Sequence, residues 1–293
     1  MRWDFGTILQ GIRKAKGITQ SQVCGNQLAR PTLSKIENNR EIPNVENFDF
    51  ILRQLDMTYA EFDYICHAYR PSGNSRIIYA FEHMAGRASR QECRSLLEEC
   101  ETYLKTHQDY RIQKIALLLR THLAIQETGQ SGQTHALAQR LWQELERSDE
   151  WYWSDFRLLQ VLVPTLPVES LIELSDKLVC SLEKYRDFKE ITDTKFGLLH
   201  QLGTLFLDRH LFLECLRVTR LADAVAQKSL QMDYLGLVWV RLGLLEQDRG
   251  MVDKGLSVLR LAGLESLAAS QEKKVTSLWD VVARWQSGRE DNL

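Results

Sequence analysis

Four polar side chains between Arg30 and Lys35 carry the chemistry that stands out in this sequence. Arg30 and Lys35 are cationic hydrogen-bond donors, and Thr32 and Ser34 lie between them with hydroxyl groups. Guanidinium and ammonium groups bind phosphate oxygens and guanine edges, hydroxyls bond to either, and a threonine methyl can contact a thymine methyl. This combination predicts a surface that binds double-stranded DNA.

A short helix is needed to turn these groups toward a partner, and the apolar spacing predicts one. Leu33 and Ile36 lie three residues apart and point to one side. A helix that enters the major groove needs a small, polar and basic outer face. The residues left on that face are Pro31, Thr32, Ser34, Lys35 and Asn38.

The positive charge of the chain is concentrated near this helix. The 293 residues carry a net charge of -2, so no general attraction to nucleic acid follows. Residues 1–40 nevertheless contain seven lysines and arginines against two acids. The local excess supports DNA binding by the N-terminal region alone.

Capping residues divide residues 1–69 into five short helices. Thr19 and Gln22 form a capping box for the second helix, and Pro31 fits the first position of the third. The N-caps of the fourth and fifth helices are Asn44 and Thr58. Five helices in so few residues leave little room for an enzyme pocket, which favours a binding module.

The stretch ITQSQVCGNQLARPTLSKIENNREIP resembles the phage-repressor type of helix-turn-helix domain, with its I-T-Q opening, S-K-I-E core and trailing proline. The resemblance implies that Gln20 binds a backbone phosphate. It also implies that Glu37 of the recognition helix pairs with Arg13 of the first helix, and Arg13 is placed among the DNA-binding residues. The turn is one residue shorter than in the phage repressors, and Gln27 stands where glycine is usual. That shortened form resembles the Rgg/MutR regulators of Gram-positive bacteria.

Plainer roles for these residues remain open. Arg13 can serve only to hold Glu37, and Gln20 can serve only as part of a cap. Most hydrogen bonds between proteins and DNA go to phosphate and sugar, so the four recognition-helix residues are weighed between base and phosphate contact.

The segment Arg70-Pro71-Ser72-Gly73-Asn74 predicts a boundary between two domains. We expect a DNA-binding domain at residues 1–69, a linker at 70–74 and a helical domain at 75–293. A hinge and a simple connection are equally supported by the linker sequence.

A forty-residue repeat organises the second domain. LGTLFLDRHLFLECLRVTRLA at 202–222 and LGLLEQDRGMVDKGLSVLRLA at 242–262 agree at ten of twenty-one positions, each reading as helix, Asp-Arg turn and helix. A small residue, Cys215 or Gly255, lies twelve positions after each glycine. This pattern resembles tetratricopeptide packing, and no alternating strand pattern is present. The predicted fold is all-α, a five-helix helix-turn-helix domain followed by a tetratricopeptide-like helical-repeat domain.

Stacked helix pairs form a concave surface that suits an extended peptide or protein segment. The blocks WVRLGLLEQDRGMVDKGLSVLRLA and KFGLLHQLGTLFL resemble the C-terminal repeats of Rgg/MutR regulators. That resemblance covers the whole chain, strongly at 5–62 and moderately at 195–262. It implies a cytoplasmic homodimer that senses a short secreted and re-imported peptide, as in quorum sensing.

Four side chains are candidates for the peptide site, each with a plainer alternative. The asparagine that binds the ligand backbone in related sensors has no counterpart between 75 and 291. The histidine and glutamine below can be satisfied polar groups between helices, and the tryptophan can be core. The candidates are Trp153, Arg157, His200 and Gln201. Further on, Trp279, Val282 and Trp285 form a stripe that is either a terminal cap or a dimer seam.

Motifs of catalysis are missing from the sequence. No GxxxxGK, GxSxG or HExxH occurs, and the Ser181–Lys184 pair lacks the companion motifs of an SxxK enzyme. We therefore expect no enzyme activity and no cofactor.

The six cysteines predict thiols rather than disulfides or a metal site. They are scattered without a CxxC pair, as buried or half-buried thiols of a reducing cytoplasm would be. A site at Cys93, Cys100 and His107 is a remote alternative, so no metal is predicted. No apolar run approaches the ~18 residues of a membrane span, so we expect a soluble cytoplasmic protein without membrane contact.

The leading hypothesis is a homodimeric transcription regulator that binds an inverted-repeat operator with recognition helices about 34 Å apart and responds to a short signalling peptide. One alternative is a dimeric regulator without a ligand, whose repeats contact RNA polymerase. Another is a helical-repeat adaptor that has lost DNA binding. The peptide, the operator, the regulated genes, the sign of regulation and any cysteine pairing across the dimer do not follow from the sequence.

Overall fold

The computed structural model describes residues 4–70, 73–84, 89–128, 139, 142–143, 145–166, 168–188 and 191–290. Every regular element in these ranges is a helix, which confirms the all-α prediction. None of the described helices is long and apolar enough to cross a membrane.

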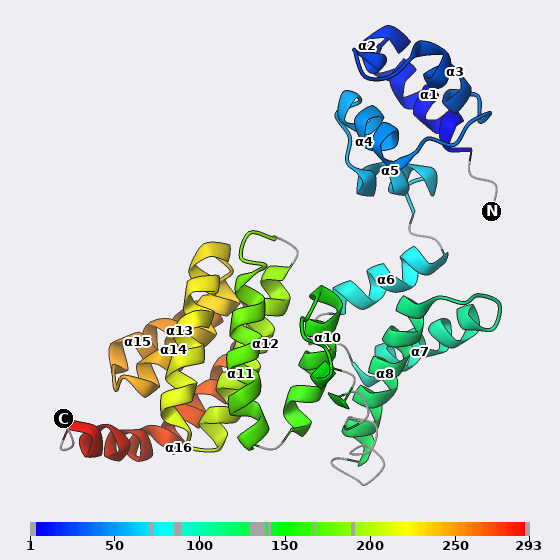
Figure 1. Cartoon of the computed structure of the whole chain (residues 1–293). Helices are drawn as coiled ribbons and strands as arrows, with labels where there is room; N and C mark the ends of the chain where they lie inside the picture. Colours follow the sequence, from blue (N-terminus) through cyan, green and yellow to red (C-terminus); the bar gives the residue numbers. More distant parts are fainter. Residues whose placement is uncertain are drawn as a thin grey trace. The chain divides into compact units, whose positions relative to one another are not determined.

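The chain forms two compact units, drawn in Figure 1. One contains Met1–Arg87 and Glu98–Gln113, and the other contains Ala88–Leu97 and Lys114–Leu293. Helix α6 (Gly73–His83) already begins inside the predicted 70–74 linker, so two residues of that segment are helical. Pro71 and Ser72 lie outside the described residues. The domain limits at 69 and 75 stay a prediction.

The first unit contains the five predicted N-terminal helices. The Thr19 hydroxyl accepts a hydrogen bond from the backbone N–H of Gln22, and the Gln22 side-chain oxygen accepts one from the backbone N–H of Thr19, so the predicted capping box is confirmed. Pro31 occupies the second helical position rather than the first, because α3 already begins at Arg30. The helices are α1 (Phe5–Ala15), α2 (Gln20–Cys24), α3 (Arg30–Glu37), α4 (Val45–Gln54) and α5 (Tyr59–Cys66).

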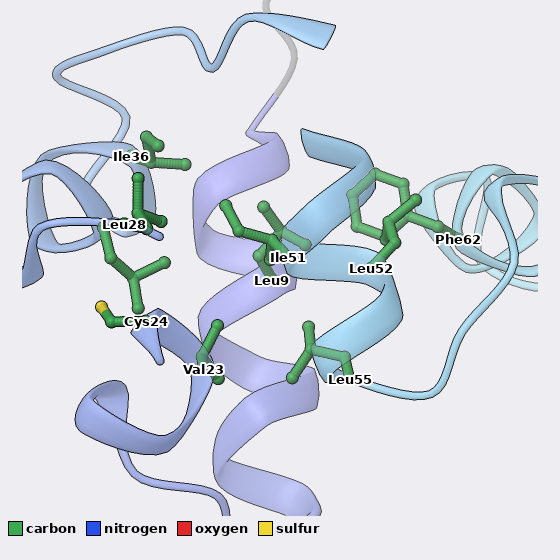
Figure 2. Packing of buried hydrophobic residues seen from close by; sticks show 10 residues of the cluster. Leu9, Val23, Cys24, Leu28, Ile36, Ile51, Leu52, Leu55 and Phe62 are labelled. Carbon is green, nitrogen blue, oxygen red and sulfur yellow. The ribbon is translucent and has the colours of Figure 1, made fainter. Parts of the chain in front are cut away.

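One apolar core holds these five helices together, and Figure 2 shows its packing. Leu9 of α1 and Ile51 of α4 both belong to this core, and both are 1% exposed. Leu33 and Ile36 bring α3 into the same core. Burying each such side chain contributes about 1.5–3 kcal/mol. The inward stripe of α3 therefore fixes which of its faces remains outside.

From α10 onward the remaining helices pack against one another along the chain, as Figure 1 shows. Helices α12 and α13 pack together, as do α14 and α15, which confirms the helix-pair repeat. The helices are α7 (Arg90–Leu104), α8 (Tyr110–Thr128), α10 (Trp153–Leu162), the 3-10 helix η1 (Val163–Thr165), α11 (Val168–Glu183), α12 (Thr192–Asp208), α13 (Phe212–Ser229), α14 (Met232–Leu245), α15 (Arg249–Leu261) and α16 (Glu265–Glu290).

Small residues let the paired helices approach closely, as the repeat predicted. The Cys215 thiol donates to the Gly203 carbonyl at 3.1 Å, across α12 and α13. A Cβ on Gly243 would lie 2.7 Å from the Val252 nitrogen and 2.8 Å from the Asp248 carbonyl oxygen. Only glycine fits this position without a shift of the backbone.

Side-chain hydrogen bonds also join α12 to α10 and α14 to α12, each time to a residue 41 positions earlier in the sequence. The Gln201 amide donates to the Gln160 carbonyl at 2.9 Å, 41 residues earlier. Arg241 occupies the equivalent place one repeat later and donates to the His200 carbonyl at 2.9 Å, again 41 residues earlier. The forty-residue repeat thus extends to the hydrogen bonds between repeats.

The stripe on the last helix packs against its own chain. Val282 is fully buried, and the Trp285 ring lies 5.3 Å from the Phe212 ring. The Gln247 amide donates to the Trp279 carbonyl at 3.3 Å. These contacts support the terminal-cap interpretation of α16.

One part of the cysteine prediction was wrong. Cys180 is exposed, whereas the other five are buried or half-buried. Leu178 and Leu182 occupy the inward side of α11 and are nearly inaccessible, so Cys180, two residues from each, turns to the opposite face.

Candidate functional site

The outward face of α3 has the composition that the sequence predicted. Arg30, Pro31 and Lys35 are exposed, and Thr32 and Ser34 are half-buried. The Lys35 ammonium lies 3.8 Å from Glu41, an exposed pair that restrains it little. The hydroxyls and cations of α3 are therefore accessible to a partner.

Glu37, the last residue of α3, forms a buried ion pair with Arg13 of α1. The Arg13 Nε donates to Glu37 Oε1 at 2.5 Å, and Nη2 donates to Glu37 Oε2 at 2.9 Å. The remaining terminal nitrogen donates to the Ile18 carbonyl at 2.9 Å. Arg13 is 9% and Glu37 2% exposed. The pair predicted from the family resemblance is present, and it ties α3 to α1.

Both members of the pair are held in their charged forms. The hydrogen bond to Glu37 raises the pKa of Arg13. Burial alone would raise the pKa of Glu37, but hydrogen bonds from Arg13 and Gln20 outweigh it, and the pKa is lowered. A bidentate, charge-assisted pair of this kind offsets the cost of burying both charges.

Gln20 connects the buried pair to the exposed end of α3. Its amide nitrogen donates to Glu37 Oε2 at 2.9 Å, and its amide oxygen accepts from Arg30 Nε at 3.4 Å. Gln20 therefore orients the first residue of α3.

The Arg13 guanidinium is buried and bonded to Glu37 and Ile18, and its predicted contact with DNA stays a prediction. Of the two open alternatives, the structural one describes its position. The predicted contacts of Gln20, Arg30, Thr32, Ser34 and Lys35 with DNA stay predictions.

The four candidates for peptide contact lie on two helices that pack together, α10 and α12. The Arg157 guanidinium lies 5.3 Å from the Trp153 ring centroid, and the Phe188 ring meets that tryptophan edge-on at 5.7 Å. The Gln201 side-chain amide donates to the Gln160 carbonyl. Their role in ligand binding stays a prediction.

His200 faces a buried arginine, Arg241, that was not among the predicted site residues. The Arg241 guanidinium is 5% exposed and donates to the Thr204 hydroxyl at 2.6 Å. One of its nitrogens lies 3.4 Å from His200 Nε2, which must accept there, so the other ring nitrogen carries the proton. Burial, followed by the charges of Arg241 and Lys274, lowers the pKa of His200 well below its usual range. Arg241 could have been predicted from the sequence, because the forty-residue repeat places it at the position equivalent to Gln201.

The cysteine and histidine side chains do not gather into a metal site within the described ranges. Cys93 and Cys100 are buried, whereas His107 is exposed and stacks on Tyr103 at 4.2 Å. The remote alternative of a site at these three residues is not supported.

Known proteins resemble both the N-terminal domain and the chain as a whole. Residues 9–62 match the helix-turn-helix family. No curated protein sequence matches the chain. A proposed transcriptional regulator from Listeria monocytogenes EGD-e is similar in structure, with 15% identity, a TM-score of 0.69 and coverage of 99% of both chains.

Two further solved structures are similar over nearly the same length. The SHP pheromone receptor Rgg2 of Streptococcus dysgalactiae has 15% identity and a TM-score of 0.65, over 93% of this chain and 99% of that one. ComR of S. thermophilus, solved with DNA and its signalling peptide ComS, has 13% identity and a TM-score of 0.62, over 95% and 99%. The shared fold agrees with the resemblance to Rgg/MutR regulators. Residues 9–62 therefore form a domain of the helix-turn-helix family, and the whole chain has the fold of Rgg2 and ComR.

Proposed function

We propose that the chain is a sequence-specific DNA-binding transcription regulator whose helical repeats bind a short peptide and thereby alter promoter output. The observation that carries the proposal is the exposed, polar and basic face of α3, anchored to α1 by the Arg13–Glu37 pair. It lies in a helix-turn-helix domain joined to the repeat fold of pheromone receptors. A fixed helix with a free outer face suits the major groove.

In this proposal each α3 side chain has its own contact with DNA. Arg30, held at its Nε by Gln20, presents its terminal nitrogens to a guanine edge or a phosphate. Thr32 and Ser34 contact base edges, and Lys35 contacts phosphate or guanine. Gln20 binds a phosphate with the amide hydrogen that Glu37 does not use. Arg13 acts through Glu37, as a positioning residue.

A homodimer in the cytoplasm follows from the same proposal, because two copies present two recognition helices to an inverted repeat. The peptide contacts are assigned to the surface of α10 and α12 that carries Trp153, Arg157, His200 and Gln201. No catalytic role is proposed for any residue.

Selection from a random duplex library with the intact chain tests DNA binding. The selected duplex is then titrated by fluorescence anisotropy at several salt concentrations. We expect Lys35→Ala to weaken binding and to reduce the salt slope by about one. The matched control is Lys273→Ala, an exposed lysine of α16. If no sequence is enriched, the proposed function is wrong, and the alternative of a helical-repeat adaptor that has lost DNA binding is favoured.

Calorimetric titration with synthetic peptides encoded by short reading frames beside the gene tests ligand sensing. We expect one peptide to bind and to change the affinity for the selected duplex. Arg157→Ala should weaken that binding, whereas Arg284→Ala, an exposed arginine of α16, should not. Normal DNA binding that no peptide alters would favour the ligand-independent regulator.

A further inference from the structure

The end of the recognition helix carries a second attachment to α1, formed by Asn39. Its backbone is left-handed, with φ of 56°. The Asn39 amide donates to the Ile36 carbonyl at 2.9 Å, and the Arg40 amide donates to the Lys35 carbonyl at 2.8 Å. This pair of bonds closes a helix C-terminus, and the left-handed position usually holds glycine. Asparagine tolerates it and adds a side chain.

That side chain caps a different helix. Asn39 Oδ1 accepts from the Gly6 amide at 2.8 Å, 33 residues earlier in the chain. Its Nδ2 donates to the Thr7 hydroxyl at 2.8 Å. The residue in the local capping position, Asp4, makes no side-chain cap. The Gly6 amide in the first turn of α1 therefore takes its cap from Asn39, just past the end of α3, rather than from Asp4.

The backbones are close enough that this cap cannot slide. A Cβ added to Gly6 would lie 1.8 Å from the Ile36 carbonyl oxygen and 2.7 Å from Asn39 Oδ1. The first turn of α1 and the last turn of α3 are thus in direct backbone contact. Any tilt of α3 at this point must break the two Asn39 bonds or compress this contact.

The same turn of α3 is gripped at a second point along α1. Glu37 is held by Arg13, which lies seven residues, about 10 Å, from Gly6 along the helix axis. One attachment alone permits rotation about itself, whereas two separated attachments fix a direction. Asn39 and Glu37 together therefore set the angle at which α3 leaves the domain.

We propose that Asn39 is a positioning residue for DNA recognition, which fixes the angle of α3 through the start of α1 so that its outer face meets the base edges in register. The proposal rests on the proposed DNA-binding function. Base-edge bonds require correct alignment, whereas attraction to phosphates tolerates misalignment. Loss of the Asn39 side chain should therefore reduce sequence-specific binding much more than non-specific binding.

The test compares four full-length variants. Asn39→Gly keeps the left-handed backbone and removes both side-chain bonds. Asn39→Asp keeps the acceptor for Gly6, and Thr7→Val removes only the partner of Nδ2. Thr58→Ala is the matched control, because it removes an N-cap in the same bundle, that of α5, far along the chain from α3. Each is titrated with the duplex selected by the intact chain and with a scrambled duplex, at a temperature where circular dichroism shows the variant folded.

We expect Asn39→Gly to weaken binding of the selected duplex about tenfold, as for loss of a base contact, and of the scrambled duplex by less than about twofold. Asn39→Asp should lie between Asn39→Gly and the intact chain, and Thr58→Ala should preserve the ratio of the two affinities. In nuclear magnetic resonance spectra, the Gly6 amide should exchange faster with solvent in Asn39→Gly.

An unchanged affinity ratio in folded Asn39→Gly would overturn the inference and leave the proposed function intact. If Asn39→Gly does not fold, Asn39→Asp and Thr7→Val decide together, because each removes the bond between Nδ2 and Thr7, and an unchanged affinity ratio in both would overturn the inference. If the intact chain selects no sequence, the proposed function itself fails, which is a separate result.

Discussion

Arg13 and Glu37 join the first and third helices through two parallel hydrogen bonds, of 2.5 and 2.9 Å, in a site that is almost closed to solvent. The pair makes the recognition helix part of the rigid bundle. Gln20 extends it to Arg30, so a chain of side chains runs from the interior to the exposed face of α3.

Replacement of Arg13 by alanine should therefore be costly. Glu37 would remain charged in a buried position, and we expect a loss of about 3–5 kcal/mol of stability in the N-terminal helices. Hydrogen exchange of the α1–α5 amides in the full chain measures it. The double replacement Arg13→Met with Glu37→Met should recover much of the loss, because no charge is left unpaired. A stable Arg13→Ala variant would contradict this account of the pair.

Acid should weaken the same helices through Glu37. The pKa of Glu37 is lowered in the folded chain, so its contribution is complete above the unfolded value of about 4.3 and is lost as the pH falls through the lower folded value. The protection of the α1–α5 amides against exchange should be lower at a pH below 4 than at pH 7. Glu37→Gln should not show this loss of protection. Glu46→Gln, at an exposed carboxyl of α4, should show it.

Two glycines of α1 should respond in opposite ways to alanine. Gly6→Ala places a methyl group against the Ile36 carbonyl and should destabilise the bundle by about 1–3 kcal/mol or more. A Cβ on Gly11 meets no atom within 4 Å, so Gly11→Ala should stabilise the helix by about 0.5–1 kcal/mol. Thermal melting of both variants measures the difference. Equal effects would mean that α1 and α3 are not in close contact.

The contact between α14 and α15 should be equally sensitive at Gly243. An added methyl would lie 2.7 Å from the Val252 nitrogen, so Gly243→Ala should lower the denaturant midpoint of the repeat domain. Gly288 of α16 has open space around its Cβ position, and Gly288→Ala should leave the midpoint unchanged or slightly higher. Tryptophan fluorescence during urea unfolding reports on this domain. A midpoint that Gly243→Ala leaves in place would argue against tetratricopeptide-like packing here.

Alkylation should find one fast-reacting cysteine. Cys180 is exposed, whereas burial raises the pKa of Cys24, Cys93 and Cys215, and burial with the nearby Asp63 charge raises that of Cys66 to about 11. The thiolate is the reactive form, so iodoacetamide should modify Cys180 first. Peptide mass spectrometry after short exposure identifies the site. Rapid labelling that persists in Cys180→Ser would contradict the assigned burial.

Most helices of the described chain, and the faces they expose, could be predicted from the amino-acid sequence. Caps such as Thr19 with Gln22, and the Leu33–Ile36 stripe, depend on residues three or four apart, so local spacing predicts them. The repeat at 202–222 and 242–262 likewise predicted the helix pairs and their small contact residues. These signals are local or periodic, and propensity and hydrophobic spacing are enough to read them.

Several contacts between side chains far apart in the sequence were visible only in the folded chain. The fold buried Arg13 against Glu37, engaged Gln20 with both Glu37 and Arg30, and brought Asn39 to Gly6 across 33 residues. It also turned Cys180 outward. Such contacts depend on how helices cross and how closely their backbones approach, and no local pattern encodes either quantity.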